Sequence, residues 1–147
     1  MLNIFAYCSN MTNTNIPVSV TRIDANAFNG CDNQVEVKVG FSSPMSIVST
    51  VFTNRKNAIL IVPAGCKDAF ASAAYWKEFK GIFEDKEYAI GDVNHDDDVN
   101  VTDASILVDF ILGNKQEFFF IESADYDKNG IINVSDVTNL VDIILSK

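Results

Sequence analysis

The sequence predicts an α+β protein of two domains: a short β-rich, repeat-type unit closed by a capping helix, followed by an all-α pair of loop-helix units. Short apolar or alternating runs separated by turns fill residues 1–89, which is typical of strands. Within residues 90–147 one segment occurs twice. The charge divides at the same place, because residues 1–89 are neutral overall and the rest carry the whole net charge of −9. We place the domains at 1–88 and 89–147.

The composition excludes several classes of protein. With 48% hydrophobic residues the chain can bury a core, and its net charge of −9 would repel nucleic acid and anionic membranes. No apolar stretch approaches the roughly 18 residues of a membrane span. The segment 1–15 lacks the basic start and apolar core of a secretory signal, so we expect either an intracellular protein or a fragment. The three cysteines allow at most one disulfide, with one thiol left over, and are expected to be small buried apolar residues.

Three strands and one helix are predicted in the first domain. The strands are the apolar run Leu2–Tyr7, the alternating segment 35–39 with its three valines, and the run Ala58–Val62, which Pro63 ends. From Lys67 to Phe79 apolar residues recur at helical spacing, with Phe70, Ala73, Ala74 and Trp76 as one buried stripe.

The same residues carry a family resemblance. Residues 16–31, reading IPVSVTRIDANAFNGC, resemble one unit of the BspA-like leucine-rich repeats of bacterial surface proteins. Val62–Gly65, together with residues 69–70 and 75–82, is similar to the segment that closes such arrays. The resemblance implies a solenoid end with a capping helix. Since about three stacked repeats are needed to bury a continuous core, we expect the capped end of a longer array.

A direct repeat organises the second domain. Residues 92–112 align without gaps on residues 125–145, and nine of the 21 pairs are identical. Each copy opens with a polar loop, 92–103 or 125–136, and continues into an amphipathic helix. The helical stripes are Ile106, Leu107, Phe110 and Ile111 in the first copy and Leu140, Val141, Ile144 and Leu145 in the second. Nothing helical precedes the first loop, so each unit is a loop and one following helix.

The two loops have the residue spacing of a calcium site. Oxygen-bearing side chains stand at loop positions 1, 3, 5, 9 and 12, and position 7 offers its backbone carbonyl. The oxygen-only donor set fits Ca²⁺ rather than a softer metal. We therefore predict two Ca²⁺ sites, with the ligands Asp92, Asn94, Asp96, Asp98, Asn100 and Asp103 in the first loop and Asp125, Asp127, Asn129, Ile131, Asn133 and Asp136 in the second.

Position 6 of each loop must turn sharply, which requires a positive φ. Gly130 meets this requirement in the second loop, and Asp97 replaces it in the first; Asp is among the few other residues that adopt a positive φ without large cost. Thr102 and Ser135 are expected to cap their helices, and His95 to face solvent. The run 118–121, reading FFFI, is expected to be core between the two helices, with an exposed docking patch as the alternative.

Residues 90–147 resemble a type I dockerin domain in loop chemistry, repeat length and helix pattern. The resemblance implies two calcium sites, antiparallel packing of the helices and binding of a cohesin-like domain or another surface protein. The contacting pairs it implies are Val101 with Thr102 and Val134 with Ser135. Many dockerins have Ser-Thr at these positions, whereas Val is typical of dockerin-like modules on gut-bacterial surface proteins. By the same resemblance we expect an extracellular or cell-surface protein.

We therefore interpret the chain as a non-enzymatic, calcium-binding interaction module on a repeat scaffold, serving adhesion or complex assembly. Residues 1–89 offer no catalytic pair, and the acidic residues of the second domain belong to its loops. Two alternatives remain open. The chain could belong to a polysaccharide-degrading assembly, or the calcium could be purely structural, with the second domain packed on the chain's own repeats.

Overall fold

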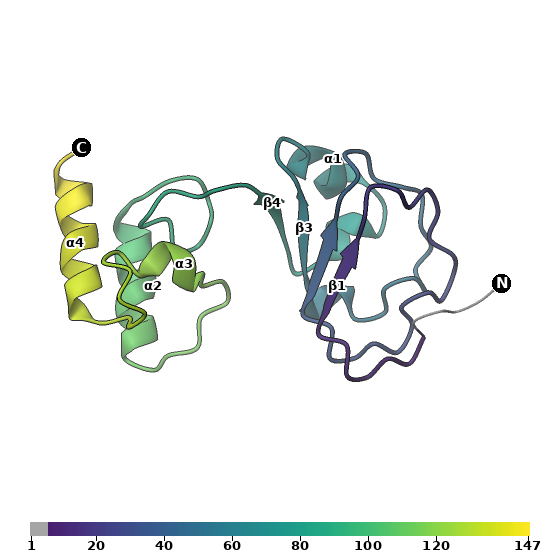
Figure 1. The fold of residues 1–147 in the computed structure, drawn as a ribbon, viewed down its shortest axis with the longest axis horizontal. Coiled ribbons are helices and arrows are strands. Elements are labelled where there is room, and N and C mark those ends of the chain that lie inside the picture. Colours follow the sequence, from purple (N-terminus) through teal and green to yellow (C-terminus); the bar gives the residue numbers. More distant parts are fainter. Residues whose placement is uncertain (1–5) are drawn as a thin grey trace. The chain divides into compact units, whose positions relative to one another are not determined.

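The computed structural model describes residues 6–147, which divide into two compact units, one up to Lys86 and one from Glu87 to Lys147. Figure 1 shows the helices and strands of each unit. Of the predicted Leu2–Tyr7 strand, residues 2–5 lie outside the described residues, and the remaining two lie in a turn.

The first unit is built on a four-stranded parallel sheet whose strands follow one another in chain order. The strands are β1 (Asn13–Ile16), β2 (Glu36–Val39), β3 (Ile59–Pro63) and β4 (Gly81–Asp85). Their first residues pair with one another, so each strand starts at the same level of the sheet as the strand before it. The predicted strands at 35–39 and 58–62 are confirmed with small shifts of their ends. The strands β1 and β4 were not predicted.

Alternate strand residues point into one core. Val37 and Leu60 are fully buried, and the next inward positions on the same strands continue the pattern. Beneath the sheet, the Phe28 and Phe52 rings stack at 4.9 Å between centroids, and Phe52 also meets the Trp76 ring at 5.7 Å. Val35, predicted as part of the alternating strand, lies before β2 begins and is 55% exposed. Phe28, Phe52 and Trp76 thus form a row of aromatic rings along the core, as the strands form a row in the sheet.

The predicted continuous helix Lys67–Phe79 is wrong. The α-helix α1 (Lys67–Ser72) is short, and a separate 3₁₀ turn, η2 (Trp76–Glu78), follows. Between them Tyr75 has a φ of 65°, a left-handed conformation that redirects the chain. Trp76 is fully buried, and its indole N–H donates to the Met45 carbonyl at 2.8 Å. The chain leaves the helix because the indole reaches this partner from the turn. A further 3₁₀ turn, η1, spans Arg55–Asn57.

The second unit contains the helices α2 (Val101–Ile111), α3 (Ile121–Ala124) and α4 (Val134–Leu145). The helices α2 and α4 pack side by side and run in opposite directions (Figure 1). Their shared core is small and consists of Val93, Val99, Ala104, Leu107, Ala124 and Leu140. The segment directly before the first loop is not helical, as predicted, whereas the single turn α3 before the second loop was not predicted.

Gly91 marks a close approach between the first loop and α4. Its φ is 98°, and a Cβ there would lie 2.7 Å from the Leu140 Cδ1 atom. Glycine therefore allows the start of the first loop to reach α4. Throughout residues 6–147, no helix combines the length and the apolar character that crossing a membrane requires.

The contrast between Val37 and Val35 gives a matched test of the sheet. Val37→Ala removes two buried methyl groups and leaves a cavity, so we expect a loss of about 2 kcal/mol in the stability of the first unit. Val35→Ala, the same change at a nearby exposed position, should alter stability by less than about 0.5 kcal/mol. Trp76 is the single tryptophan of the chain, so its fluorescence during urea unfolding follows this unit alone. Equal effects of the two substitutions would contradict the described packing.

Candidate metal centres

The two polar loops share one backbone conformation. His95 and Asp97, at positions 4 and 6 of the first loop, have φ of 56° and 75°. Lys128 and Gly130, at the same positions of the second, have φ of 54° and 82°. The predicted left-handed turn at position 6 is confirmed in both loops. The left-handed residue at position 4 was not predicted.

The acid at position 1 folds each loop back on itself. In the first loop Asp92 accepts hydrogen bonds from the backbone amides of Asp96 and Asp97, both at 3.0 Å. Asp125 accepts from the amides at the same two positions of the second loop, at 3.1 and 2.8 Å. Each carboxylate thus gathers the amides at positions 5 and 6 around itself, which curls the loop.

The acid at position 12 closes the loop. Asp103 accepts from the amides of Val93 and Asn100, at positions 2 and 9, each at 2.9 Å. Asp136 makes the same two bonds in the second loop, again at 2.9 Å. Both aspartates are fully buried. One side chain therefore ties the beginning of the loop to the beginning of the helix that follows it.

The helix caps differ from the prediction. Asn100 and Asn133 are the N-cap residues, and their side-chain oxygens accept from the amides of Thr102 and Ser135 at 2.7 and 2.8 Å. Thr102 and Ser135 are therefore capped residues inside the first turn, and the prediction that they cap the helices is wrong. The signal was present in the sequence, because an asparagine followed three positions later by an acid can form a capping box.

The acid and the amide at positions 3 and 5 are interchanged between the two loops. In the first loop Asn94 donates its side-chain N–H to Asp96 at 2.8 Å. In the second loop Asn129, at position 5, donates to Asp127, at position 3, at 2.7 Å. The exchange preserves the hydrogen bond and the number of oxygen donors.

Three acids of the second loop converge on one point. Asp125, Asp127 and Asp136 offer carboxylate oxygens that all lie within 4.8 Å of one another. Burial raises the pKa of both Asp92 and Asp103, and neighbouring carboxylates add to the rise. Across residues 6–147, no lysine or arginine makes an ion pair with Asp92, Asp103 or Asp136. These three carboxylates fit a hard cation, because their donor atoms are oxygen and no described lysine or arginine pairs with them.

The loops differ in burial and charge. The first contains five acids, and the Lys147 ammonium lies 2.8 Å from the Val99 carbonyl and 3.9 Å from Asp98 at its edge. The second contains three acids and Lys128, and its position 1 is only partly buried. The two loops thus have a similar form, and in the second loop three of the predicted ligands, Asp125, Asp127 and Asp136, lie close together.

His95 does not face solvent, and that prediction is wrong. The imidazole is 7% exposed and lies between the Tyr88 and Phe120 rings, each nearly parallel to it at 3.7 Å between centroids. Its Nε2 atom is hydrogen-bonded to the Ser123 hydroxyl at 2.9 Å. The stack fixes the start of the first loop to the segment between the two repeats. Sequence spacing gave no signal for it, because its partners come from both sides of the loop.

Each long helix of this unit presents an exposed apolar stripe. Val101 and Val134, at equivalent positions, are 69% and 68% exposed. Exposed apolar residues follow on the same faces, namely Val108 and the C-cap residue Leu112 along α2, and Val141 and Leu145 along α4. The predicted core at 118–121 is realised in part, since Phe119 packs against the core and stacks on Phe110, whereas Ile121 is exposed.

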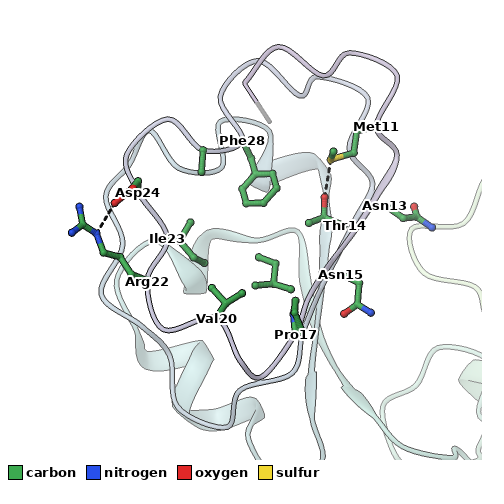
Figure 2. A pocket seen from close by; sticks show the side chains of 12 residues that line it. Met11, Asn13, Thr14, Asn15, Pro17, Val20, Arg22, Ile23, Asp24 and Phe28 are labelled. Carbon is green, nitrogen blue, oxygen red and sulfur yellow. Dashed lines mark hydrogen bonds and ion pairs between the residues drawn. The ribbon is translucent and has the colours of Figure 1, made fainter. Parts of the chain in front are cut away.

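A cavity of about 490 Å³ lies in the first unit beside β1. Figure 2 shows Val20, Ile23 and Phe28 around it, with the Arg22–Asp24 ion pair at one side. Its lining is mostly apolar, and the one carboxylate among the lining residues is that of Asp24, which is already paired. The cluster of acids that could hold a metal ion lies in the second loop rather than at this cavity.

Family models match the two units separately. The family described as the BspA type leucine rich repeat region (6 copies) matches residues 2–82, more than half of the chain. The chain belongs to the BspA-type leucine-rich repeat family. The dockerin type I domain matches residues 90–145, so a dockerin domain follows the repeat region. Searches of the curated proteins and of the solved structures found no match. Both families are interaction modules rather than catalytic domains.

The closing acid of the second loop can be tested without metal. Asp136→Ala leaves the amides of Tyr126 and Asn133 without their acceptor, so we expect a loss of about 2 kcal/mol in the stability of the dockerin domain, measured with a chelator present. Asp142→Ala, on the exposed face of the same helix, serves as the control and should change stability by less than about 0.5 kcal/mol. Thermal unfolding by far-ultraviolet circular dichroism follows this domain, which holds most of the helix. Coincident curves for the two variants would contradict the role of Asp136 in closing the loop.

Proposed function

We propose that the dockerin domain binds two Ca²⁺ ions and, so ordered, docks a partner protein, while the leucine-rich repeats act as the scaffold that carries it. The observation that supports this proposal is the duplicated loop. Three acids converge in its second copy, and no described lysine or arginine makes an ion pair with the buried acids Asp92, Asp103 and Asp136. A dockerin domain is a module that generally binds calcium, and the oxygen-only donors here suit that ion.

The residues that would hold the ions are the predicted ones. Side-chain oxygens at positions 1, 3, 5, 9 and 12 and the carbonyl at position 7 supply the donors in both loops. They are Asp92, Asn94, Asp96, Asp98, Asn100 and Asp103, and Asp125, Asp127, Asn129, Ile131, Asn133 and Asp136. When bound, calcium supplies the positive charge that balances these groups, so metal binding and folding of this domain are coupled.

The docking surface we propose is the exposed stripe on each helix, beginning at Val101 with Thr102 and at Val134 with Ser135. These residues are exposed and stand directly after the loops. Apolar side chains held in water on a rigid helix suit an apolar partner surface. Dockerin domains bind cohesin domains, and a cohesin-like domain is therefore the partner we propose, with nucleic acid disfavoured by the negative charge.

We further propose a non-enzymatic role outside the cell, in adhesion or in complex assembly. The support is that both families are typical of extracellular and surface proteins. Membership of a polysaccharide-degrading assembly would follow if the partner were a cohesin on such an assembly. If no partner bound in either the presence or the absence of calcium, the ion would have a purely structural role.

Calcium titration tests the metal sites. With calcium at 100 times its dissociation constant, we expect the dockerin domain to gain about 2.7 kcal/mol per independent site, and a chelator to remove this gain. The Trp76 fluorescence transition should not move, because it follows the repeat unit. Asp103→Ala and Asp136→Ala should each remove one site in calorimetric titration. An unchanged titration in both variants would reject the proposal.

Capture of purified cohesin domains tests the surface. Because α2 and α4 present equivalent stripes, Val101→Asp or Val134→Asp alone should leave binding through the other helix, within about tenfold of the original affinity. The double variant should lose capture while its calcium titration stays normal, since both valines lie outside the core. Cohesin binding that is equal with and without chelator, or retained in the double variant, would exclude this docking mode.

A further inference from the structure

Two of the three cysteines occupy the same corner of successive coils of the repeat unit. The amide of Met11 donates to the Cys8 carbonyl at 3.0 Å, and the amide of Gln34 donates to the Cys31 carbonyl at 3.1 Å. The residue before each cysteine has a positive φ, 60° at Tyr7 and 75° at Gly30. The sequence separation of Cys8 and Cys31 equals that of Asn13 and its strand partner Glu36. The turn therefore repeats with the same period as the strands.

The next coil shows that this corner is a column of equivalent positions. The amide of Asn57 donates to the Asn54 carbonyl at 2.9 Å. This is the same turn, and Asn54 follows Cys31 by the same number of residues as Cys31 follows Cys8. Asn54 therefore stands where a third cysteine would stand. The column reads Cys8, Cys31, Asn54.

A backbone hydrogen bond joins the two coils beside the cysteines. The amide of Tyr7 donates to the carbonyl of Asn29 at 2.7 Å, which joins the two coils beside the cysteines. Hydrogen-bonded neighbouring chains lie about 4.8 Å apart, inside the Cα separation of about 4.4–6.8 Å that a disulfide spans. Burial raises the pKa of Cys31, a hydrogen bond from the Cys8 backbone opposes that rise, and the Cys8 thiol adds to it. The Cys31 sulfur therefore lies beside the Cys8 backbone.

We propose that Cys8 and Cys31 form a disulfide in an oxidising environment and so staple the first two coils of the repeat unit together. Both are thiols in the structure described here. Cys31 is fully buried, whereas Cys8 is partly exposed and is the first to meet an oxidant. This inference does not depend on calcium or on the dockerin partner.

The reaction balances with a disulfide oxidant such as oxidised glutathione. The Cys8 thiolate attacks one sulfur of the oxidant, which releases one thiol and leaves a mixed disulfide on Cys8. The Cys31 thiolate then attacks the Cys8 sulfur and releases the second thiol. The two protein thiols are oxidised, the oxidant is reduced to two thiols, and these carry away the two protons.

The staple would act where the sheet ends. The strand β1 pairs with β2 on one side, and no other described strand pairs with it. A cross-link between residues 8 and 31 restricts the unfolded chain and ties the segment before β1 to the coil that follows it. It would protect this edge of the sheet against fraying.

The experiment is oxidation of the purified full chain by oxidised glutathione, with free thiols counted by a colorimetric reagent under denaturing conditions. We expect three thiols before oxidation and one afterwards, with the Cys8 and Cys31 peptides joined in a mass map. Oxidation should raise the Trp76 fluorescence midpoint temperature by about 10 °C. A reducing agent should reverse both changes.

Three serine variants separate this proposal from other thiol chemistry. Cys66→Ser should still lose two thiols, because Cys66 lies after the end of β3 with its thiol directed at the Ala64 carbonyl. The Cys8→Ser variant should lose no thiols to an intramolecular disulfide. The folded Cys31→Ser variant should likewise lose none. A stable glutathione adduct on Cys8, a bond to Cys66, or thiols unchanged in the original chain would overturn the proposal.

Discussion

The dockerin domain depends on two fully buried aspartates, Asp103 and Asp136, each of which accepts two backbone hydrogen bonds at 2.9 Å. One bond holds the start of a loop and the other holds the start of a helix. The acid therefore sets both the curvature of the loop and the direction in which the helix leaves it. The helices carry Leu107 and Leu140 into the small shared core, so the packing of the unit follows from these bonds. The same burial that strengthens the bonds makes an unneutralised charge costly.

Sequence reasoning recovered the central strands of the repeat unit and missed its outer ones. Two strands were predicted because their inward residues are apolar, as at Val37 and Leu60. The strand β1, reading NTNI, has one buried side chain, and its place in the sheet is given by register with β2 rather than by its own pattern. Periodicity within one segment reports on one strand at a time. The longer repeat becomes visible only when equivalent turns are compared, and in the third coil an asparagine has replaced the cysteine.

The bounds and the shared form of the two polar loops could be predicted, because the spacing of their side chains is a local property of each loop. The spacing could not predict the tertiary contacts of the loops. The ring stack of Tyr88, His95 and Phe120 joins residues from before, within and after the first loop, and no local pattern links them. The end of α1 at Ser72 has the same origin, since the distant Met45 carbonyl determines where the Trp76 indole must lie. In both places a contact between remote segments overrides the local preference.

The two loops can differ in sequence and still share one form, because backbone amides supply the hydrogen bonds that shape them. The acids at positions 1 and 12 accept from backbone amides at positions 2, 5, 6 and 9, so the side chains at positions 2, 4, 6 and 7 take no part in these bonds. Those are the positions at which the copies differ most in character. A buried valine corresponds to an exposed tyrosine at position 2, a stacked histidine to an exposed lysine at position 4, and an acid to an isoleucine at position 7. Because the main chain supplies the hydrogen-bond donors, one copy can be buried and strongly acidic and the other open and weakly charged without any change in form.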